Sequence, residues 1–261
     1  MGTVVILGAG AGFGMAIARA FAQQGDHPIL VARHPDSLKK LCAQLQSENL
    51  SADYLVADST DAVQTASMFD DIQKRWELPT TLVYNVADTS LDNPLESRLD
   101  EISHRFTVNV LGAISTIRQF LALTPDDTPR NILVTGGGAA LHPGQLTTSL
   151  SLTKAALRSY IFSLAPAVKD RGVYVGLITI QGIAGTSTEM EPVNVAQAYT
   201  QAARDRTATE IFYPGGEPNA TSEFDQLQAL TSDPEKLYAF LEEHAGAAAF
   251  IRSHPGFLKR H

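Results

Sequence analysis

A glycine-rich loop near the N-terminus is the first stretch whose residues could do chemistry. Leu7-Gly8-Ala9-Gly10-Ala11-Gly12-Phe13-Gly14 follows an apolar run, precedes a helical pattern and has a GxxxGxG spacing. Glycines at such a turn let the backbone approach a pyrophosphate, and the N–H groups that open the helix attract its charge. The stricter GxGxxG spacing fails here, because Phe13 or Met15 falls at its last position. The context still predicts a dinucleotide site at Gly8, Gly12, Phe13 and Gly14.

The end of the second apolar run predicts which dinucleotide binds. An NAD site needs an acidic residue there to accept a hydrogen bond from the ribose 2′-hydroxyl. Here the run ends Val31-Ala32-Arg33-His34, so Ala32 fills the acidic position and Arg33 follows it. A guanidinium group suits a 2′-phosphate. The sequence therefore favours NADP over NAD, against the simpler interpretation that Arg33 is only a surface arginine.

These features resemble the short-chain dehydrogenase/reductase family over residues 1 to about 216. Asp58 follows the third apolar run, where the family's aspartate contacts the adenine. Asn85, in Tyr84-Asn85-Val86-Ala87, lies where the family usually has NNAG. The segment Gln181-Gly182-Ile183-Ala184-Gly185-Thr186 is similar to the family's PGxxxT, with Gln in place of Pro. The resemblance implies that Ile183 and Thr186 hold the nicotinamide carboxamide and the phosphate.

Only half of the family's catalytic tetrad has a match. Lys154, in the run TTSLSLTK, matches the lysine that binds the nicotinamide ribose, and Asn109, in VNVLG, matches the asparagine. The tyrosine that protonates the carbonyl oxygen should lie four residues before the lysine on the same helix face, and that residue is Leu150. The serine position falls on Gly137. A general acid contributes roughly 10²–10⁴ in rate, so the family's ordinary carbonyl-reductase mechanism should be crippled.

Another group would then have to polarise the carbonyl, and the candidates near these motifs are His142, Tyr84, Thr148, Ser149 and Ser151. Histidine titrates near physiological pH, which suits His142 to proton transfer, although a loop histidine before a proline is the simpler interpretation. Ser149 and Ser151 fit helix-start or packing positions better. The seven histidines show no metal-ligand spacing such as HExxH, so no metal is expected.

Alternating apolar runs and helical patterns must position these residues. The expected strands are Thr3–Leu7, Pro28–Ala32, Ala52–Ala57, Thr80–Tyr84, Asn131–Thr135, Val173–Ile180 and Thr209–Tyr213. The expected helices are Gly14–Gln24, Pro35–Ser47, Asp61–Trp76, Ser97–Leu123, Ser149–Lys169 and Pro192–Arg204. Uniformly apolar strands separated by helices are typical of a parallel sheet covered on both faces. The sequence predicts an α/β, Rossmann-type, doubly wound parallel sheet of about seven strands with a helical C-terminal extension.

The substrate side departs from the family in a second way. Only five residues separate Thr186 from Pro192, so we expect the loop that covers the substrate in this family to be absent here. Residues 217–261 continue beyond the last strand as a helical segment, and Ser232-Asp233-Pro234-Glu235 predicts a helix start within it. Its apolar residues must pack on something: they are Phe224, Leu227, Leu230, Leu237, Phe240, Leu241, Phe250, Ile251 and Phe257. We expect a domain over 1–216 and an appendage over 217–261 that closes the site, contacts a second subunit or packs on the sheet edge.

Composition and charge bound the partners. The chain has 261 residues, with 20 Lys and Arg against 28 Asp and Glu, a net charge of −8 that disfavours nucleic acid and anionic membranes. A single cysteine, Cys42, allows no internal disulfide and favours a structural role, and no signal peptide or membrane span is evident. We expect a cytoplasmic protein that acts on a small molecule. The resemblance implies a homodimer or homotetramer, formed through Ser97–Leu123 and Ser149–Lys169.

Two functions remain open at this point. The first is an NAD(P)-dependent oxidoreductase that transfers hydride to or from a small carbonyl or alcohol, with a substituted or substrate-assisted proton donor. The second is a catalytically inactive NADP-binding scaffold or redox sensor. Lys154 and Asn109 favour the enzyme, because a sensor needs no active-site lysine, whereas Leu150 and Gly137 favour the sensor. The preponderance of enzymes in the family favours the oxidoreductase, which is an argument by analogy.

Overall fold

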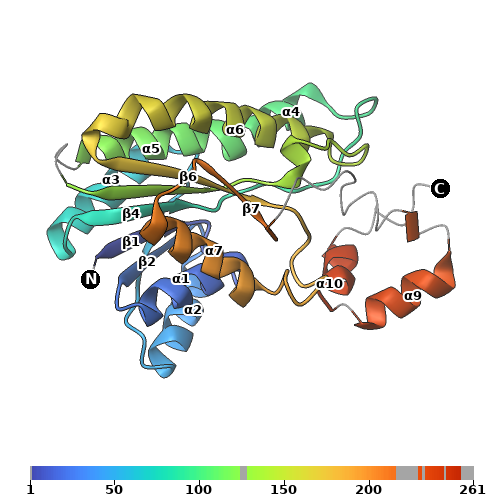
Figure 1. Cartoon of the computed structure of the whole chain (residues 1–261), viewed down its shortest axis with the longest axis horizontal. Coiled ribbons are helices and arrows are strands. Elements are labelled where there is room, and N and C mark those ends of the chain that lie inside the picture. Colours follow the sequence, from blue (N-terminus) through green and yellow to red (C-terminus); the bar gives the residue numbers. More distant parts are fainter. Residues whose placement is uncertain (1, 124–127, 216–228, 231–232, 244, 254–261) are drawn as a thin grey trace.

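A parallel β-sheet forms the centre of the protein in a computed structural model that describes residues 2–123, 128–215, 229–230, 233–243 and 245–253 (Figure 1). Its seven strands lie in the order β3-β2-β1-β4-β5-β6-β7, and every neighbouring pair is parallel. The predicted doubly wound sheet is confirmed. The strands are β1 (Thr3–Leu7), β2 (His27–Ala32), β3 (Asp53–Val56), β4 (Pro79–Tyr84), β5 (Arg130–Thr135), β6 (Val173–Ile180) and β7 (Glu210–Tyr213).

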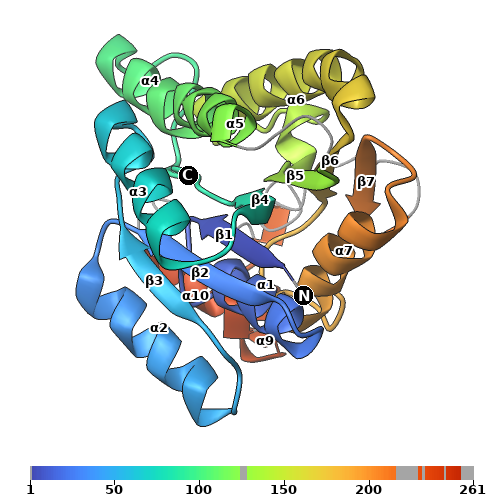
Figure 2. The ribbon, with the colours of Figure 1, turned by 90° about the vertical axis from the view of Figure 1, so that its left-hand side faces the viewer.

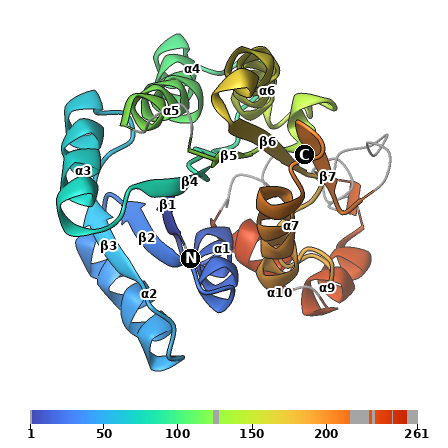
Figure 3. The same cartoon turned by 60° about the vertical axis from the view of Figure 1, so that its left-hand side comes forward.

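Helices cover both faces of the sheet (Figures 2 and 3). One face packs against α1 (Phe13–Gln23), α2 (Pro35–Ser47) and α7 (Pro192–Asp205), and the other against α3 (Ala62–Arg75), α5 (Gly112–Leu123) and α6 (Thr148–Val168). Side chains alternate along each strand, so Val4 and Ile6 join the first core while Val5 and Leu7 join the second. Because both faces are covered, the central strands are mostly apolar.

The predicted helix Ser97–Leu123 is wrong in one respect, because it is not a single regular helix. It begins as α4 (Leu99–Phe106), passes through a π-helical turn at Thr107–Leu111 and continues as α5. Asn109 lies in that turn and is fully buried. A π turn inserts one residue into a helix and is frequent at functional sites. The wider turn lets Asn109 face inward while the helix continues on either side.

The run Leu99–Leu123 is, within the described part of the chain, the one helical stretch long and apolar enough by length and composition to cross a membrane. Half of its most apolar window is buried inside the fold. Ile117 and Phe120 of this run belong to the core beneath the sheet. That burial is the pattern of a core helix. Cys42, on α2, is also buried, and its burial, with the nearby Asp53, raises its thiol pKa to about 11, as suits a structural role.

Two C-terminal helices, α9 (Pro234–Glu243) and α10 (Ala245–Ser253), lie beyond the carboxyl ends of the strands (Figure 1). Their Leu237 and Ile251 are buried with Leu146 and Ile183, from the loops after β5 and β6. Leu91, from the loop after β4, and Leu230, Phe240 and Leu241 pack around this cluster. The helical extension predicted from the sequence is therefore present, and it contacts three loops at one edge of the sheet.

Asp233 lies at the start of α9. The Oδ1 of Asp233 accepts a hydrogen bond from the backbone N–H of Lys236 at 3.3 Å, so Asp233 caps the first turn. The predicted cap, Ser232, lies outside the described residues. So do the predicted domain boundary at 216/217 and Phe224, Leu227 and Phe257, and nothing is described of the Phe250 side chain.

The turn after β1 depends on one glycine. Gly8 has a φ of 80°, and a Cβ there would lie 2.6 Å from the carbonyl carbon of Asn85. Gly8→Ala should lower the free energy of unfolding by at least about 2 kcal/mol, since the left-handed conformation and the clash both oppose it. Gly10→Ala is the matched control, because no atom lies within 4 Å of its added Cβ. Denaturant unfolding measures both; equal stabilities of the two variants would contradict this account.

Candidate active site

A cavity of about 380 Å³ opens at the carboxyl ends of β1, β4, β5 and β6. Its walls come from the loops after these strands and from two residues of α6, Leu150 and Lys154. A second cavity, of about 860 Å³, runs from the glycine loop past the ends of β2 and β3. The strand order reverses between β1 and β4, and ligands of open α/β sheets bind outside the strand ends at such a point. The two cavities therefore occupy the expected ligand site of this fold.

The glycine loop has the shape that a phosphate cradle requires. A Cβ on Gly14 would lie 2.7 Å from the Ala9 Cα, so Gly14 is needed for close packing of the loop on α1. At Gly12 nothing lies within 4 Å of an added Cβ, so this glycine leaves open space at the start of α1. No side chain caps that start. The loop thus offers a helix N-terminus and open space to an anion, which fits the predicted roles of Gly8, Gly12 and Gly14.

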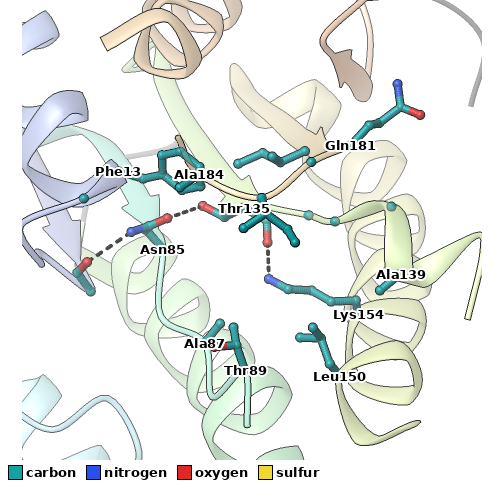
Figure 4. Close-up of a pocket in the computed structure, with 18 of the residues that line it drawn as sticks. Phe13, Asn85, Ala87, Thr89, Thr135, Ala139, Leu150, Lys154, Gln181 and Ala184 are labelled. Carbon is teal, nitrogen blue, oxygen red and sulfur yellow. Dashed lines mark hydrogen bonds between the residues drawn. The ribbon is translucent and has the colours of Figure 1, made fainter. Parts of the chain in front are cut away.

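A chain of hydrogen bonds runs beneath this loop. The Thr135 hydroxyl donates to Asn85 Oδ1 at 2.8 Å, and Asn85 Nδ2 donates to the Gly8 carbonyl oxygen at 3.1 Å (Figure 4). The Tyr199 hydroxyl lies 2.6 Å from the Thr135 hydroxyl. Because the Thr135 proton is already donated to Asn85, Tyr199 must be the donor in that contact. Tyr199 comes from α7, is fully buried and has its pKa raised by that burial.

The same threonine holds the predicted catalytic lysine. Lys154 Nζ donates to the backbone carbonyl oxygen of Thr135 at 2.7 Å (Figure 4). Burial lowers the pKa of Lys154 to about 8. Leu150 lies one helical turn earlier on α6 and lines the same cavity, and Gly137 lies against the lysine stem. Thr135 and Tyr199 were missed by sequence reasoning, and the one local signal for them is the position of Thr135 at the end of an expected strand.

Asn109 lies behind the cavity and does not line it. Its Nδ2 donates to the Thr153 hydroxyl at 2.9 Å and to the Asp88 carbonyl at 3.1 Å, and its Oδ1 accepts from the Asp88 N–H at 2.7 Å. These three bonds join the π-helical turn to α6 and to the loop after β4. Asn109 is accordingly a positioning residue for the helix that carries Lys154.

The start of α6 is held by a buried carboxylate. Asp92 accepts hydrogen bonds from the N–H of Ser149, at 3.0 Å, and from its hydroxyl, and it pairs with Arg105 Nη1 at 2.6 Å. The Ser151 hydroxyl lies 3.2 Å from that of Thr147. Ser149 and Ser151 are therefore engaged at the helix start, the alternative that the sequence favoured for them.

Of the five candidate proton donors, His142 alone lines the cavity. Its Nε2 is buried without a hydrogen-bond partner. Tyr84 was a wrong candidate, because its side chain lies in the core between the sheet and the helices α3, α5 and α6. Its hydroxyl donates to the Val108 carbonyl at 2.8 Å, and burial raises its pKa. Thr148 is not among the residues that line the cavity. The side chains of strand residues alternate between faces, which explains why Tyr84 and the adjacent Asn85 point apart.

The second cavity contains the predicted Arg33 and Asp58. Partial burial opposes ionisation of Asp58, but hydrogen bonds from the Thr60 N–H and hydroxyl, at 2.9 and 2.7 Å, and the nearby Arg33 charge bring its pKa below the usual value. Ser37 and Lys40, from the first turns of α2, line the same cavity. These two residues were missed, although their spacing after Arg33 on a predicted helix was a usable signal.

The loop after β6 brings one of its two predicted residues to the cavity. Ile183 lines the wall, and its outer side is buried against Leu146, Leu237 and Ile251. Thr186 does not line the cavity; its hydroxyl donates to the Ile183 carbonyl at 2.8 Å. The short connection that follows closes on itself, with the Gly185 N–H bonded to the Met190 carbonyl at 2.9 Å.

Comparisons with known proteins agree with this architecture. The sequence model of a family described as "short chain dehydrogenase" matches residues 2–197. A 2,3-dihydro-2,3-dihydroxybenzoate dehydrogenase of Bacillus subtilis is 27% identical over 190 residues, which are 71% of this chain and 70% of that protein. A very-long-chain 3-oxoacyl-CoA reductase of Neurospora crassa is 26% identical over 183 residues, 67% of this chain; the match spans about half of that relative, 54%.

Among solved structures, the fold is similar to that of an NADPH-bound short chain oxidoreductase of Pseudomonas aeruginosa PAO1, described as containing an atypical catalytic center. The TM-score is 0.76 at 18% identity, and the match covers 85% of this chain and 98% of that one. At this identity the likeness concerns the fold.

The buried Lys154 should make stability depend on pH. Below about pH 8 the folded protein holds an ammonium group that water solvates better in the unfolded chain, and this cost falls as the pH rises from about 8 towards 10.5, where the unfolded chain also loses the proton. Lys154→Met should therefore raise the free energy of unfolding at pH 7.5 by at most about 3 kcal/mol, with a gain that shrinks towards pH 10.5.

Urea unfolding at several pH values measures this difference. Lys169→Met, at an exposed lysine beyond the end of α6, is the control and should show no comparable trend. A Lys154→Met difference that stays constant from pH 7.5 to 10.5 would contradict the depressed pKa.

Proposed function

We propose that this chain, which belongs to the short chain dehydrogenase family, is an NADP-dependent oxidoreductase that acts on a small carbonyl or alcohol by an atypical mechanism. One observation carries the proposal: a single cavity is lined by both the glycine loop after β1 and Lys154 of α6. When bound there, NADP would supply the hydride. The chain itself would bind the dinucleotide, orient the substrate and move the proton.

Cofactor binding follows from the walls of the two cavities. The glycine loop would take the pyrophosphate at the N-terminus of α1, and Asp58 would face the adenine. Ala32 leaves no acid for a ribose 2′-hydroxyl, while Arg33, Ser37 and Lys40 line the cavity where a 2′-phosphate would lie. Two cations and a hydroxyl suit a phosphate better than a neutral ribose. The NADPH bound by the Pseudomonas aeruginosa protein is in keeping with this choice.

The preference for NADP should depend on Arg33. A charge-assisted hydrogen bond contributes about 1.5–3 kcal/mol, so Arg33→Ala should weaken NADPH binding about 10- to 100-fold and leave NADH binding unchanged. Fluorescence titration of both cofactors measures this. Arg98→Ala, at an exposed arginine paired with Asp100, is the matched control. Equal affinities for NADPH and NADH, unaltered by Arg33→Ala, would refute the NADP assignment.

The proton would come from an unusual source. We propose that Leu150 replaces the family's tyrosine and Gly137 its serine, because they lie at the corresponding places relative to Lys154. His142 is then the best replacement acid, since it lines the cavity and its Nε2 is buried without a partner. The Thr135 hydroxyl, also at the cavity, is already committed to Asn85. Lys154 would bind the nicotinamide ribose beside its Thr135 contact, with Asn109 positioning its helix.

The rival function is a catalytically inactive NADP-binding scaffold or redox sensor. Leu150 and Gly137 favour it, because both remove groups that act on substrate while leaving the cofactor side intact. The two functions make different predictions for the same variants. An enzyme with His142 as the acid loses activity when that imidazole is removed, whereas a scaffold has no activity to lose.

NADPH oxidation over a panel of ketones and diketones tests the mechanism. His142→Gln should lower turnover by roughly 10²–10⁴, and His27→Gln, at the opposite end of the sheet, should not change it. Leu150→Tyr with Gly137→Ser should raise turnover of activated ketones, because a Cβ at Gly137 would lie 3.8 Å from Lys154 Cγ and fits without a clash.

The outcomes of this panel separate the candidates. Wild-type protein that binds NADPH but turns over nothing, with activity appearing only in the double variant, would favour the scaffold. Turnover unaffected by His142→Gln would remove His142 from the mechanism.

Self-association remains a prediction. Exposed apolar side chains on the outer surface of the π-helical turn and α6, Leu111, Leu152 and Phe162, support a homodimer or homotetramer formed there. Sedimentation of the full chain tests it. A cytoplasmic location is likewise still a prediction.

A further inference from the structure

We infer that the ligand taken beside the nicotinamide is a small uncharged carbonyl compound or alcohol with an apolar substituent, and that carboxylates and phosphates are rejected. This inference rests on the proposed function, because it concerns the cavity where hydride transfer would occur. It follows from the side chains that wall the cavity and from those that the cavity lacks.

The part of the cavity away from the glycine loop is apolar or uncharged. Ala87, Ala139, Leu150, Ile183 and Ala184 form most of this wall. Among the described residues that line the cavity there is no arginine, aspartate or glutamate. A carboxylate that enters such a space loses its hydration and gains no guanidinium partner in return.

Two of the polar side chains at the cavity are directed elsewhere. The Lys154 ammonium group donates to the Thr135 carbonyl at 2.7 Å, on the side of the cavity towards Asn85 (Figure 4), and its other N–H groups would hold the nicotinamide ribose in the proposed function. The Gln181 side chain turns away from the cavity, and its Nε2 donates to the Pro214 carbonyl at 3.1 Å (Figure 4). His142 has one unpartnered nitrogen, which suits one carbonyl or hydroxyl oxygen. Among the described residues of the wall, His142 is therefore the side chain that suits one neutral oxygen, beside an apolar remainder.

The appended helices extend this apolar wall outward. Ile183 faces the cavity on one side and is buried against Leu237 of α9 and Ile251 of α10 on the other. Leu91 and Leu146 bring the loops after β4 and β5 into the same cluster. These helices hold in place the loop after β6, where the connection between Thr186 and Pro192 is too short to cover a substrate. The roof of the site is thus built from hydrocarbon side chains.

The space also has room for an apolar substituent. The cavity measures about 380 Å³ and would also receive the nicotinamide ring. A group about the size of a phenyl ring serves as the test substituent. The chemical class that fits is a ketone or secondary alcohol with one such apolar group.

A pair of matched ligands tests this class without turnover. 1-Phenylethanol and mandelate differ by a methyl group against a carboxylate, and neither can accept hydride from NADPH, so both form dead-end complexes. Calorimetric titration into the full chain saturated with NADPH measures both affinities under the same conditions. 1-Phenylethanol should bind at least about 30-fold more tightly than mandelate, because an unpaired buried carboxylate is strongly disfavoured. Equal binding, tighter mandelate binding or binding of neither ligand would overturn the inference.

A positive charge introduced into the wall should weaken the preference for 1-phenylethanol over mandelate. Ala139→Lys and Thr89→Lys each place an ammonium group at a lining position, and Ala140→Lys, at the next residue of the same short turn, is the control that does not line the cavity. Each lining variant should reduce the preference for 1-phenylethanol at least about tenfold, and the control should not. Thr89 is exposed, so its variant should fold even if Ala139→Lys does not.

An unchanged preference in a lining variant that still binds NADPH would overturn the inference. Failure of the proposed function is distinguishable from this result. A protein that binds 1-phenylethanol selectively but never oxidises NADPH would retain the substrate class and lose the hydride transfer.

Discussion

The hydrogen bonds of Thr135, at the carboxyl end of β5, connect every element that builds the site. Its carbonyl oxygen accepts a hydrogen bond from the buried Lys154 ammonium group. Its hydroxyl donates a hydrogen bond to Asn85 and accepts one from the Tyr199 hydroxyl. Asn85 in turn holds the Gly8 carbonyl, so α6, α7, β4 and the glycine loop are fixed relative to one strand end. Each of these hydrogen bonds joins groups from different elements, and bonds of this kind make a buried polar network stabilising.

The same arrangement explains what the site keeps and what it lacks. The glycine loop and Lys154, which fit a dinucleotide, are hydrogen-bonded to residues at the strand ends. Asn109 is bonded to Thr153, the residue before Lys154. The substrate side carries Leu150 and Gly137, and the one titratable side chain that faces it besides Lys154 within the described residues is His142. In the mechanism proposed above, proton transfer would fall to His142, on the loop after β5.

The apolar character of the substrate side has a second source in the C-terminal helices. Leu237 and Ile251 bury the outer side of Ile183, and through Leu91 and Leu146 they join the loops that follow β4 and β5. The loop after β6 is thus packed from outside by α9 and α10. Exclusion of water by such packing strengthens electrostatic interactions within the cavity.

The sequence by itself determined the elements whose signals are local. The seven apolar runs, the glycine loop, the missing acid at Ala32 and the four-residue step from Leu150 to Lys154 can all be read from neighbouring residues, because period and turn chemistry act over one or two turns. The side chains of Tyr84 and Asn85 point to opposite faces of the sheet, as neighbouring strand residues do, and this alternation argues against Tyr84 as a proton donor. Only the tertiary structure decided which distant groups meet. The bonds of Asn109 to Asp88 and Thr153, the pairing of Tyr199 with Thr135, the pairing of Asp92 with Arg105 at the start of α6 and the packing of α9 on Ile183 all join residues from separate elements. No local pattern encodes such contacts.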